Sequence, residues 1–201
     1  MSGFDRVNVT VRDGSSPPTV VAAQMNPLRE EIDLSGVPDG AWVVCWSGTL
    51  ADDMFAKDWG TWGDAGMSAL KSFCARVAPE FGARRLRLVL RPHARHVLSD
   101  AFRCRRFVDE NAHGFVGVAL DAASMMEHSM LDDVEGHYER AFEMLGPVAD
   151  LVIVTGLERG DEEDGPPGRP PAAVEGTFAE MVGALIGAHV PGGTPVARMT
   201  F

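Results

Sequence analysis

Short runs of almost wholly apolar residues recur along the chain, and they limit its fold more than any other feature. The runs are rich in β-branched residues, and most of them lack a polar face. Strands of this kind are typical of a parallel sheet that is covered by helices. The expected strands are residues 6–12, 18–25, 41–46, 86–91, 114–120, 151–156 and 194–201.

Amphipathic segments that predict helices lie between the later strands. The first of them repeats its apolar residues at helical spacing and ends at Gly82, and Ser99 or Asp100 is expected to cap the second. Regular alternation of strand and helix implies right-handed βαβ units. The expected helices are residues 62–82, 99–111, 132–146 and 174–190, with a long loop at 158–176.

Two folds are built from repeated βα units, an open doubly wound sheet and a closed barrel. The chain has no GxGxxG after its first strand and no GxxxxGK[ST], so the nucleotide-binding form of the open sheet has no support. A (β/α)₈ barrel usually needs about 250 residues, and the first 40 residues contain no long amphipathic helix. We therefore predict one domain over residues 1–201, a parallel (β/α) barrel that is abridged in its N-terminal part.

Charge and cysteine usage exclude several classes of protein. The formal net charge of −11 repels phosphate backbones and anionic lipid, so neither nucleic acid nor a membrane is an expected partner. No apolar stretch is long enough to span a bilayer and the N-terminus does not resemble a signal peptide, which predicts a cytoplasmic protein. Cys45, Cys74 and Cys104 are far apart and form no CxxC, which argues against a disulfide framework and a zinc site.

One stretch carries a family resemblance. Residues 114–158, GFVGVALDAASMMEHSMLDDVEGHYERAFEMLGPVADLVIVTGLE, contain a strand that ends on Asp, a loop, an amphipathic helix and a further strand. This layout resembles the sugar phosphate isomerase/epimerase superfamily, the xylose isomerase-like TIM barrels. Residues 80–110 are similar to the helix, apolar strand and Glu-Pro-His passage of that family. The resemblance covers residues 41–201 and implies a degenerate, shortened TIM-barrel-like member.

The resemblance implies a metal site that has lost most of its ligands. In that family a divalent metal such as Mn, Mg, Co or Zn is held by a Glu, an Asp, a His and a second Glu at the strand ends. The Asp is kept as Asp121, but Arg91 occupies the first Glu position and Ile153 the His position. The last Glu falls near Arg198 or Met199. We expect no metal or other cofactor unless the site has been rebuilt.

Arg91 in a metal ligand's position has two interpretations. A guanidinium cannot bind a cation and stays protonated, so it replaces the charge of the metal with a fixed positive charge. In the first interpretation Arg91 forms an ion pair with Asp121 across the vacated site. In the second it binds a carboxylate, a phosphate or another anion through two hydrogen bonds.

Histidines and tryptophans near the strand ends complete the candidate site. His93 and His96 follow the strand of Arg91, and His128 follows Asp121, so these side chains are candidates for acid/base catalysis or for a replacement metal site. Trp46 and Trp59 follow another strand, and aromatic rings stack on sugar faces, which makes them candidate ligand-binding residues.

These observations predict a pseudoenzyme. We expect a xylose isomerase-like barrel with an eroded metal site that binds a small polar or anionic, sugar-like ligand or acts as a non-catalytic partner. The alternative is an active isomerase or epimerase of sugars or related polyols in which Asp121, His93 and His128 are catalytic, with or without metal. An apolar patch left uncovered by the abridged barrel would favour a homodimer.

Overall fold

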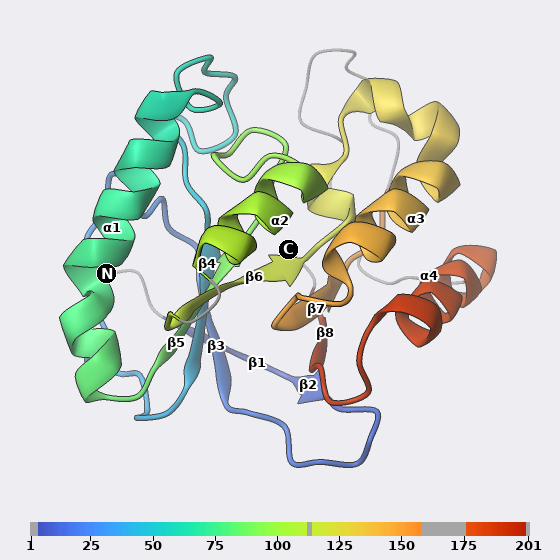
Figure 1. The fold of residues 1–201 in the computed structure, drawn as a ribbon, viewed down its shortest axis with the longest axis horizontal. Helices are drawn as coiled ribbons and strands as arrows, with labels where there is room; N and C mark the ends of the chain where they lie inside the picture. Colours follow the sequence, from blue (N-terminus) through green and yellow to red (C-terminus); the bar gives the residue numbers. More distant parts are fainter. Residues whose placement is uncertain (1–3, 112–113, 158–175, 200–201) are drawn as a thin grey trace.

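The computed structural model describes residues 4–111, 114–157 and 176–199, and these residues form an α/β fold around one barrel-shaped, nearly closed sheet (Figure 1). The strands lie in the order β1-β3-β4-β5-β6-β7-β8-β2. They are β1 Asp5–Val7, β2 Val9–Thr10, β3 Val20–Ala23, β4 Trp42–Trp46, β5 Arg87–Arg91, β6 Val116–Leu120, β7 Leu151–Val154 and β8 Val196–Arg198. The helices are α1 Asp64–Ala83, α2 Ala101–Glu110, α3 Val134–Leu145 and α4 Gly176–His189, with short 3₁₀ helices η1 Ala123–Met125 and η2 His128–Asp133.

The run from β3 to β8 confirms the predicted alternation. These six neighbouring strands are parallel, and a helix follows each of β4, β5, β6 and β7. Asp100 is the N-cap of α2, where its carboxylate accepts a hydrogen bond from the backbone N–H of Arg103 at 2.9 Å. The described residues between β3 and β4 contain no helix, and the loop expected at 158–176 lies almost entirely outside the described residues.

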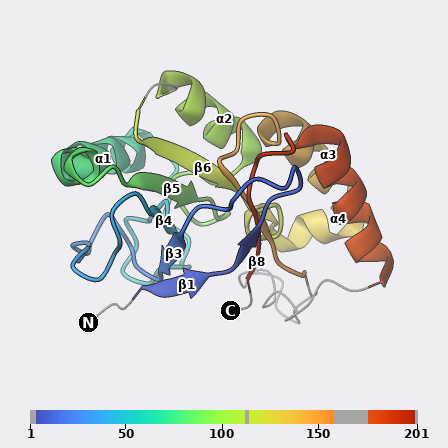
Figure 2. The ribbon, with the colours of Figure 1, turned by 90° about the horizontal axis from the view of Figure 1, so that it is seen from below.

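The N-terminal strands correct the prediction of a wholly parallel barrel. β1 pairs with β3 and β2 pairs with β8, and both pairs are antiparallel. Only Asn8 separates β1 from β2, so one short segment reaches both edges of the sheet and nearly closes it (Figure 2). A parallel neighbour would need a crossover connection of about a dozen residues or more, and this segment has none. The sheet is therefore mixed.

The closing segment has a polar outer face. Val7 lies opposite Val20 and Val9 opposite Ala197, in the apolar interior of the barrel. The alternate residues Arg6 and Thr10 are exposed. Figure 2 shows the labelled helices on the other side of the sheet, so none of the described helices covers this wall. The apolar patch that would favour a homodimer is therefore absent from the outer face of β1 and β2.

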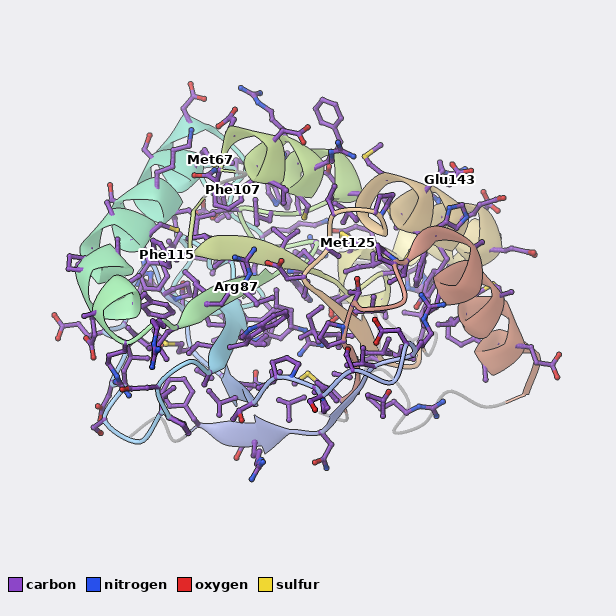
Figure 3. The ribbon with its side chains drawn as sticks, turned by 60° about the horizontal axis from the view of Figure 1, so that its bottom comes forward. Met67, Arg87, Phe107, Phe115, Met125 and Glu143 are labelled. Carbon is purple, nitrogen blue, oxygen red and sulfur yellow. The ribbon has the colours of Figure 1, made fainter. Side chains whose placement is uncertain are left out.

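Two apolar clusters fill the fold. The larger one lies between the sheet and the helices, and it includes Phe107 of α2 with Phe115 packed against it (Figure 3). The smaller one fills the barrel interior with residues such as Val44 and Val89. Charged residues occupy the same face of β5 at both ends, because Arg87 and Arg91 flank Val89 at a spacing of two residues. None of the described helices is long and apolar enough to cross a membrane.

Candidate functional site: a buried ion pair at the barrel mouth

Four parallel strands deliver polar or aromatic side chains to the same end of the barrel. Trp46 is the last residue of β4 and Arg91 the last of β5, and the two are in register. Asp121 directly follows β6, and Thr155 directly follows β7. We call the end of the barrel marked by these four residues the mouth. Carboxyl ends of parallel strands are where binding and catalytic groups gather in barrels.

Arg91 and Asp121 form a buried ion pair at the mouth. The Nε and Nη2 atoms of Arg91 lie 2.7 and 2.6 Å from Oδ2 of Asp121, and the two side chains are 2% and 0% exposed. The guanidinium carbon lies 4.2 Å from the ring centroid of Trp46, a cation–π contact. Burial lowers the pKa of Arg91, and the charge and hydrogen bonding of Asp121 oppose that effect. Both side chains are almost fully shielded from bulk solvent, so each charge depends strongly on the other.

The remaining acceptor capacity of Asp121 is also used. Its Oδ2 accepts from the Ser124 hydroxyl at 2.6 Å, and its Oδ1 accepts from the Ser124 backbone N–H and the Thr155 hydroxyl, each at 3.3 Å. A carboxylate offers about four lone-pair sites. With the two contacts to Arg91, these donors leave Asp121 no site for a metal ion or for a substrate proton in this arrangement.

His93 and His96 lie beside this ion pair in the loop between β5 and α2. Their ring centroids are 4.9 Å apart, and both rings contact Trp46 edge-on. His93 Nδ1 accepts from the backbone N–H of Arg95 at 3.1 Å, which places the ring proton of the neutral form on Nε2. His96 Nε2 donates to the carbonyl oxygen of Met54 at 2.9 Å. Its Nδ1 is buried and has no hydrogen-bond partner among the described residues.

Both histidines are held in the neutral form. Burial, then the neighbouring His96 and Arg91, lower the pKa of His93 well below its ordinary value. Burial also lowers the pKa of His96 to about 4. The hydrogen bond to Met54 opposes this effect, and the charge of Arg91 adds a smaller lowering of the pKa. At neutral pH the pair therefore offers one N–H donor and one nitrogen lone pair, and no charge.

A second ion pair ties together the loops that carry the mouth. Arg95 is 1% exposed, and its Nη2 lies 3.2 Å from Oε2 of Glu127. The backbone N–H of Ala94 donates to the carbonyl oxygen of Ser124 at 2.8 Å. These contacts join the loop after β5 to the loop after β6.

The structure brings together five of the residues expected from the sequence: Trp46, Arg91, His93, His96 and Asp121. The other two lie elsewhere. Trp59 is 83% exposed and its ring contacts the edge of Trp62, with ring centroids 5.3 Å apart. His128 begins η2 and is half-buried, and within the described residues it has no hydrogen bond or ring contact with the mouth.

Sequence reasoning missed four residues that contact the centre or enclose it. Ser124 stands three residues after Asp121, the spacing at which an Asp side chain accepts a hydrogen bond from a backbone N–H in a turn, and Thr155 directly follows a strand. Both positions could therefore have been predicted from the sequence as neighbours of Asp121. Arg95 and Glu127 gave no signal, because each lies in an irregular loop and their contact depends on how the two loops pack.

Among the described residues, no three His, Cys, Asp or Glu side chains are arranged to hold a metal ion. A scan against models of known protein families finds no match for the chain, and a search of curated proteins finds no relative. The class that can be stated is therefore the one that fold and site define: an α/β protein with a barrel-shaped sheet and a buried ion pair at its mouth.

Proposed function

We propose that the protein is a non-catalytic, xylose isomerase-like barrel with an eroded metal site, whose mouth binds a small neutral polar molecule such as a sugar or polyol. One observation carries the proposal. Asp121, the ligand position that the family resemblance retains, gives all its acceptor sites to Arg91, Ser124 and Thr155. A metal-dependent isomerase needs open carboxylate oxygens at this position to hold the cation.

The strand order supports the fold part of the proposal. The parallel run from β3 to β8, with helices after β4 to β7, matches a TIM-barrel-like arrangement from which βα units are missing. The antiparallel segment of β1 and β2 takes the place of the missing wall. In this proposal, the missing units correspond to the N-terminal abridgement predicted from the shortness of the chain.

The balance of charge supports a neutral ligand over an anion. Arg91 is paired with Asp121, Arg95 is paired with Glu127, and the histidines are neutral. A phosphate or carboxylate at the mouth would have to displace Asp121 from Arg91, which leaves a buried unpaired charge. A hydroxyl group instead matches the neutral donor of His93 and the unpaired Nδ1 of His96.

Entry of a ligand requires the loops over the mouth to separate. Described mouth residues such as His93 and His96 are at most 7% exposed, and the Arg95–Glu127 pair holds the two loops together. Opening of loops of this kind occurs on the microsecond to millisecond timescale in many proteins. The face of Trp46 lies against Arg91, so stacking on that face is not part of the proposal.

The eroded-site proposal is tested by restoring the carboxylate. Arg91→Glu places a second carboxylate beside Asp121, so we expect lower thermal stability without metal and a rise in Tm with Mn²⁺, Co²⁺ or Zn²⁺. Wild type and the control Arg91→Met are expected to show no metal-induced rise. Stoichiometric metal in purified wild type that is lost in Asp121→Asn would overturn the proposal, as would an Arg91→Glu protein that no metal stabilises.

Ligand binding is tested by titration with neutral sugars and polyols, with the matching sugar phosphates and sugar acids alongside. Isothermal calorimetry on the wild type is expected to detect a neutral compound. We expect His96→Phe to weaken binding, because it removes the unpaired Nδ1, whereas His137→Phe on α3 should not. Binding of the charged compounds alone would contradict the charge argument. An active isomerase that uses Asp121, His93 and His128 stays the alternative, although no contact at the mouth favours it.

A further inference from the structure

The side chain of Tyr138 on α3 is buried, and no described residue is a hydrogen-bond partner of its hydroxyl group. Tyr138 is 2% exposed, and its oxygen has no hydrogen bond to any described residue. Its ring packs against Phe142 and Phe178, which fixes its position. Burial, and then the negative charge of Asp121, raise the pKa of Tyr138, so the phenol keeps its proton and is a hydrogen-bond donor. Buried hydroxyl groups almost always find a partner.

A small cavity adjoins Tyr138. It lies between α3, α4 and the carboxyl ends of β6 and β7, and its free volume for the centre of a water molecule is about 10 Å³. A cavity needs roughly 10–15 Å³ of such volume to hold one water, so a single water fits and an organic ligand does not. Among the described lining residues, Tyr138 and Thr155 are the ones with a polar side-chain atom.

The hydrogen-bond roles at this cavity are complementary. The Thr155 hydroxyl donates its proton to Oδ1 of Asp121 at 3.3 Å, so its lone pairs remain as acceptors. Tyr138 has a proton to donate and no acceptor among the described residues. A water molecule between them accepts from Tyr138 and donates to Thr155, which satisfies both hydroxyl groups.

We propose that this cavity is a binding site for one ordered water molecule that links Tyr138 to Thr155 and so to Asp121. The network then runs from the buried ion pair at the mouth to helix α3. Tyr138 is in this view a positioning residue, which acts on Asp121 through the water and Thr155 and does not touch it. The proposal concerns the side of Asp121 that faces α3, and it stands whether or not the mouth binds a ligand.

A double-mutant cycle in urea unfolding tests the proposal. Tyr138→Phe is expected to raise the unfolding equilibrium constant roughly two- to tenfold, the net value of a typical buried hydrogen bond. Thr155→Val removes the other partner, so Tyr138→Phe should have little further effect in that background. A dry, unpaired hydroxyl gives the opposite sign: its removal would leave stability unchanged or increase it, and this result would overturn the proposal.

A second measurement on the wild type keeps the test independent of mutant folding. Tyr138 is the single tyrosine of the chain, so its ring signals are unambiguous in NMR. Magnetisation transfer from a long-lived water to the Tyr138 ring is expected in the wild type and should be lost in Thr155→Val. Absence of such transfer in the wild type would overturn the water site.

Discussion

The two ends of β5 each carry an arginine–aspartate pair, and the pairs differ in their exposure to water. At the mouth, Arg91 and Asp121 are 2% and 0% exposed. At the other end, Arg87 and Asp150 are 33% and 18% exposed. Arg87 nevertheless has the more regular geometry, because its Nε and Nη2 bond separate oxygens of Asp150 at 2.9 and 2.8 Å. Figure 3 shows Arg87 beside β6.

The comparison indicates different roles for the two pairs: Arg87–Asp150 is a structural link, here called a clamp, whereas Arg91–Asp121 is a buried polar centre whose two charges cancel. The Arg87–Asp150 pair joins β5 to the residue that directly precedes β7, and it is partly exposed to solvent. Gly117 makes room for the pair, since a Cβ there would lie 1.5 Å from Oδ2 of Asp150. The Arg91–Asp121 pair is buried, and two neutral histidines and Trp46 lie beside it. If the pairs behave alike when broken, the mouth is a second clamp; if they differ, the mouth is a specialised polar centre.

The largest loss of stability is expected when the charge of Arg91 is removed from the mouth. Arg91→Met leaves Asp121 buried and unpaired, and we expect a loss of about 3–5 kcal/mol in the free energy of unfolding. Arg91→Met combined with Asp121→Leu is expected to recover most of that loss, because the uncompensated charge is gone. Urea unfolding measures both. A loss below 1 kcal/mol for the single change would show that water reaches Asp121.

At acid pH, protonation of groups at the mouth is expected to lower the stability of the protein, whereas protonation at the other end of β5 is not. The pKa values of His93 and His96 are lowered in the folded protein, so the unfolded chain binds protons first and stability falls as the pH drops from 6.5 towards about 4. The slope is about 1.4 kcal/mol per pH unit for each histidine. Burial raises the pKa of Asp150 despite Arg87, so that group favours the folded state on acidification.

Thermal unfolding between pH 4 and pH 7 measures this difference. The variant in which His93→Phe and His96→Phe are combined should have a flatter profile than wild type, while Asp150→Asn should leave the loss of stability below pH 6.5 in place. An unchanged slope in the double histidine variant would assign the acid sensitivity to other groups.

The smallest effect is expected from Arg87→Met. The pair it breaks is partly exposed, so the loss should be about 1 kcal/mol or less and should shrink further in high salt. The same urea titrations at low and high ionic strength check both statements. A loss equal to that of Arg91→Met would remove the distinction between the two ends.

Periodicity and strand ends made much of this molecule readable from the sequence. The strands from β3 to β8, the four helices and the Asp100 cap follow from local patterns that each segment carries by itself, whereas the one strand expected at residues 6–12 is two short strands, β1 and β2. The meeting of Trp46, Arg91 and Asp121 was also predictable, because carboxyl ends of neighbouring parallel strands share one edge. Both interpretations of Arg91 were consistent with that placement.

Tertiary structure alone decided how these parts are joined. Three features depend on contacts between distant segments. They are the antiparallel closure of the sheet by β1 and β2, the pairing of Arg91 with Asp121, and the ion pair of Arg95 with Glu127. Asp121 lies 30 residues from Arg91, and Asp150 lies 63 residues from Arg87. Local sequence sets which groups are available, but whether two charges meet and whether water reaches them depends on packing of the whole barrel.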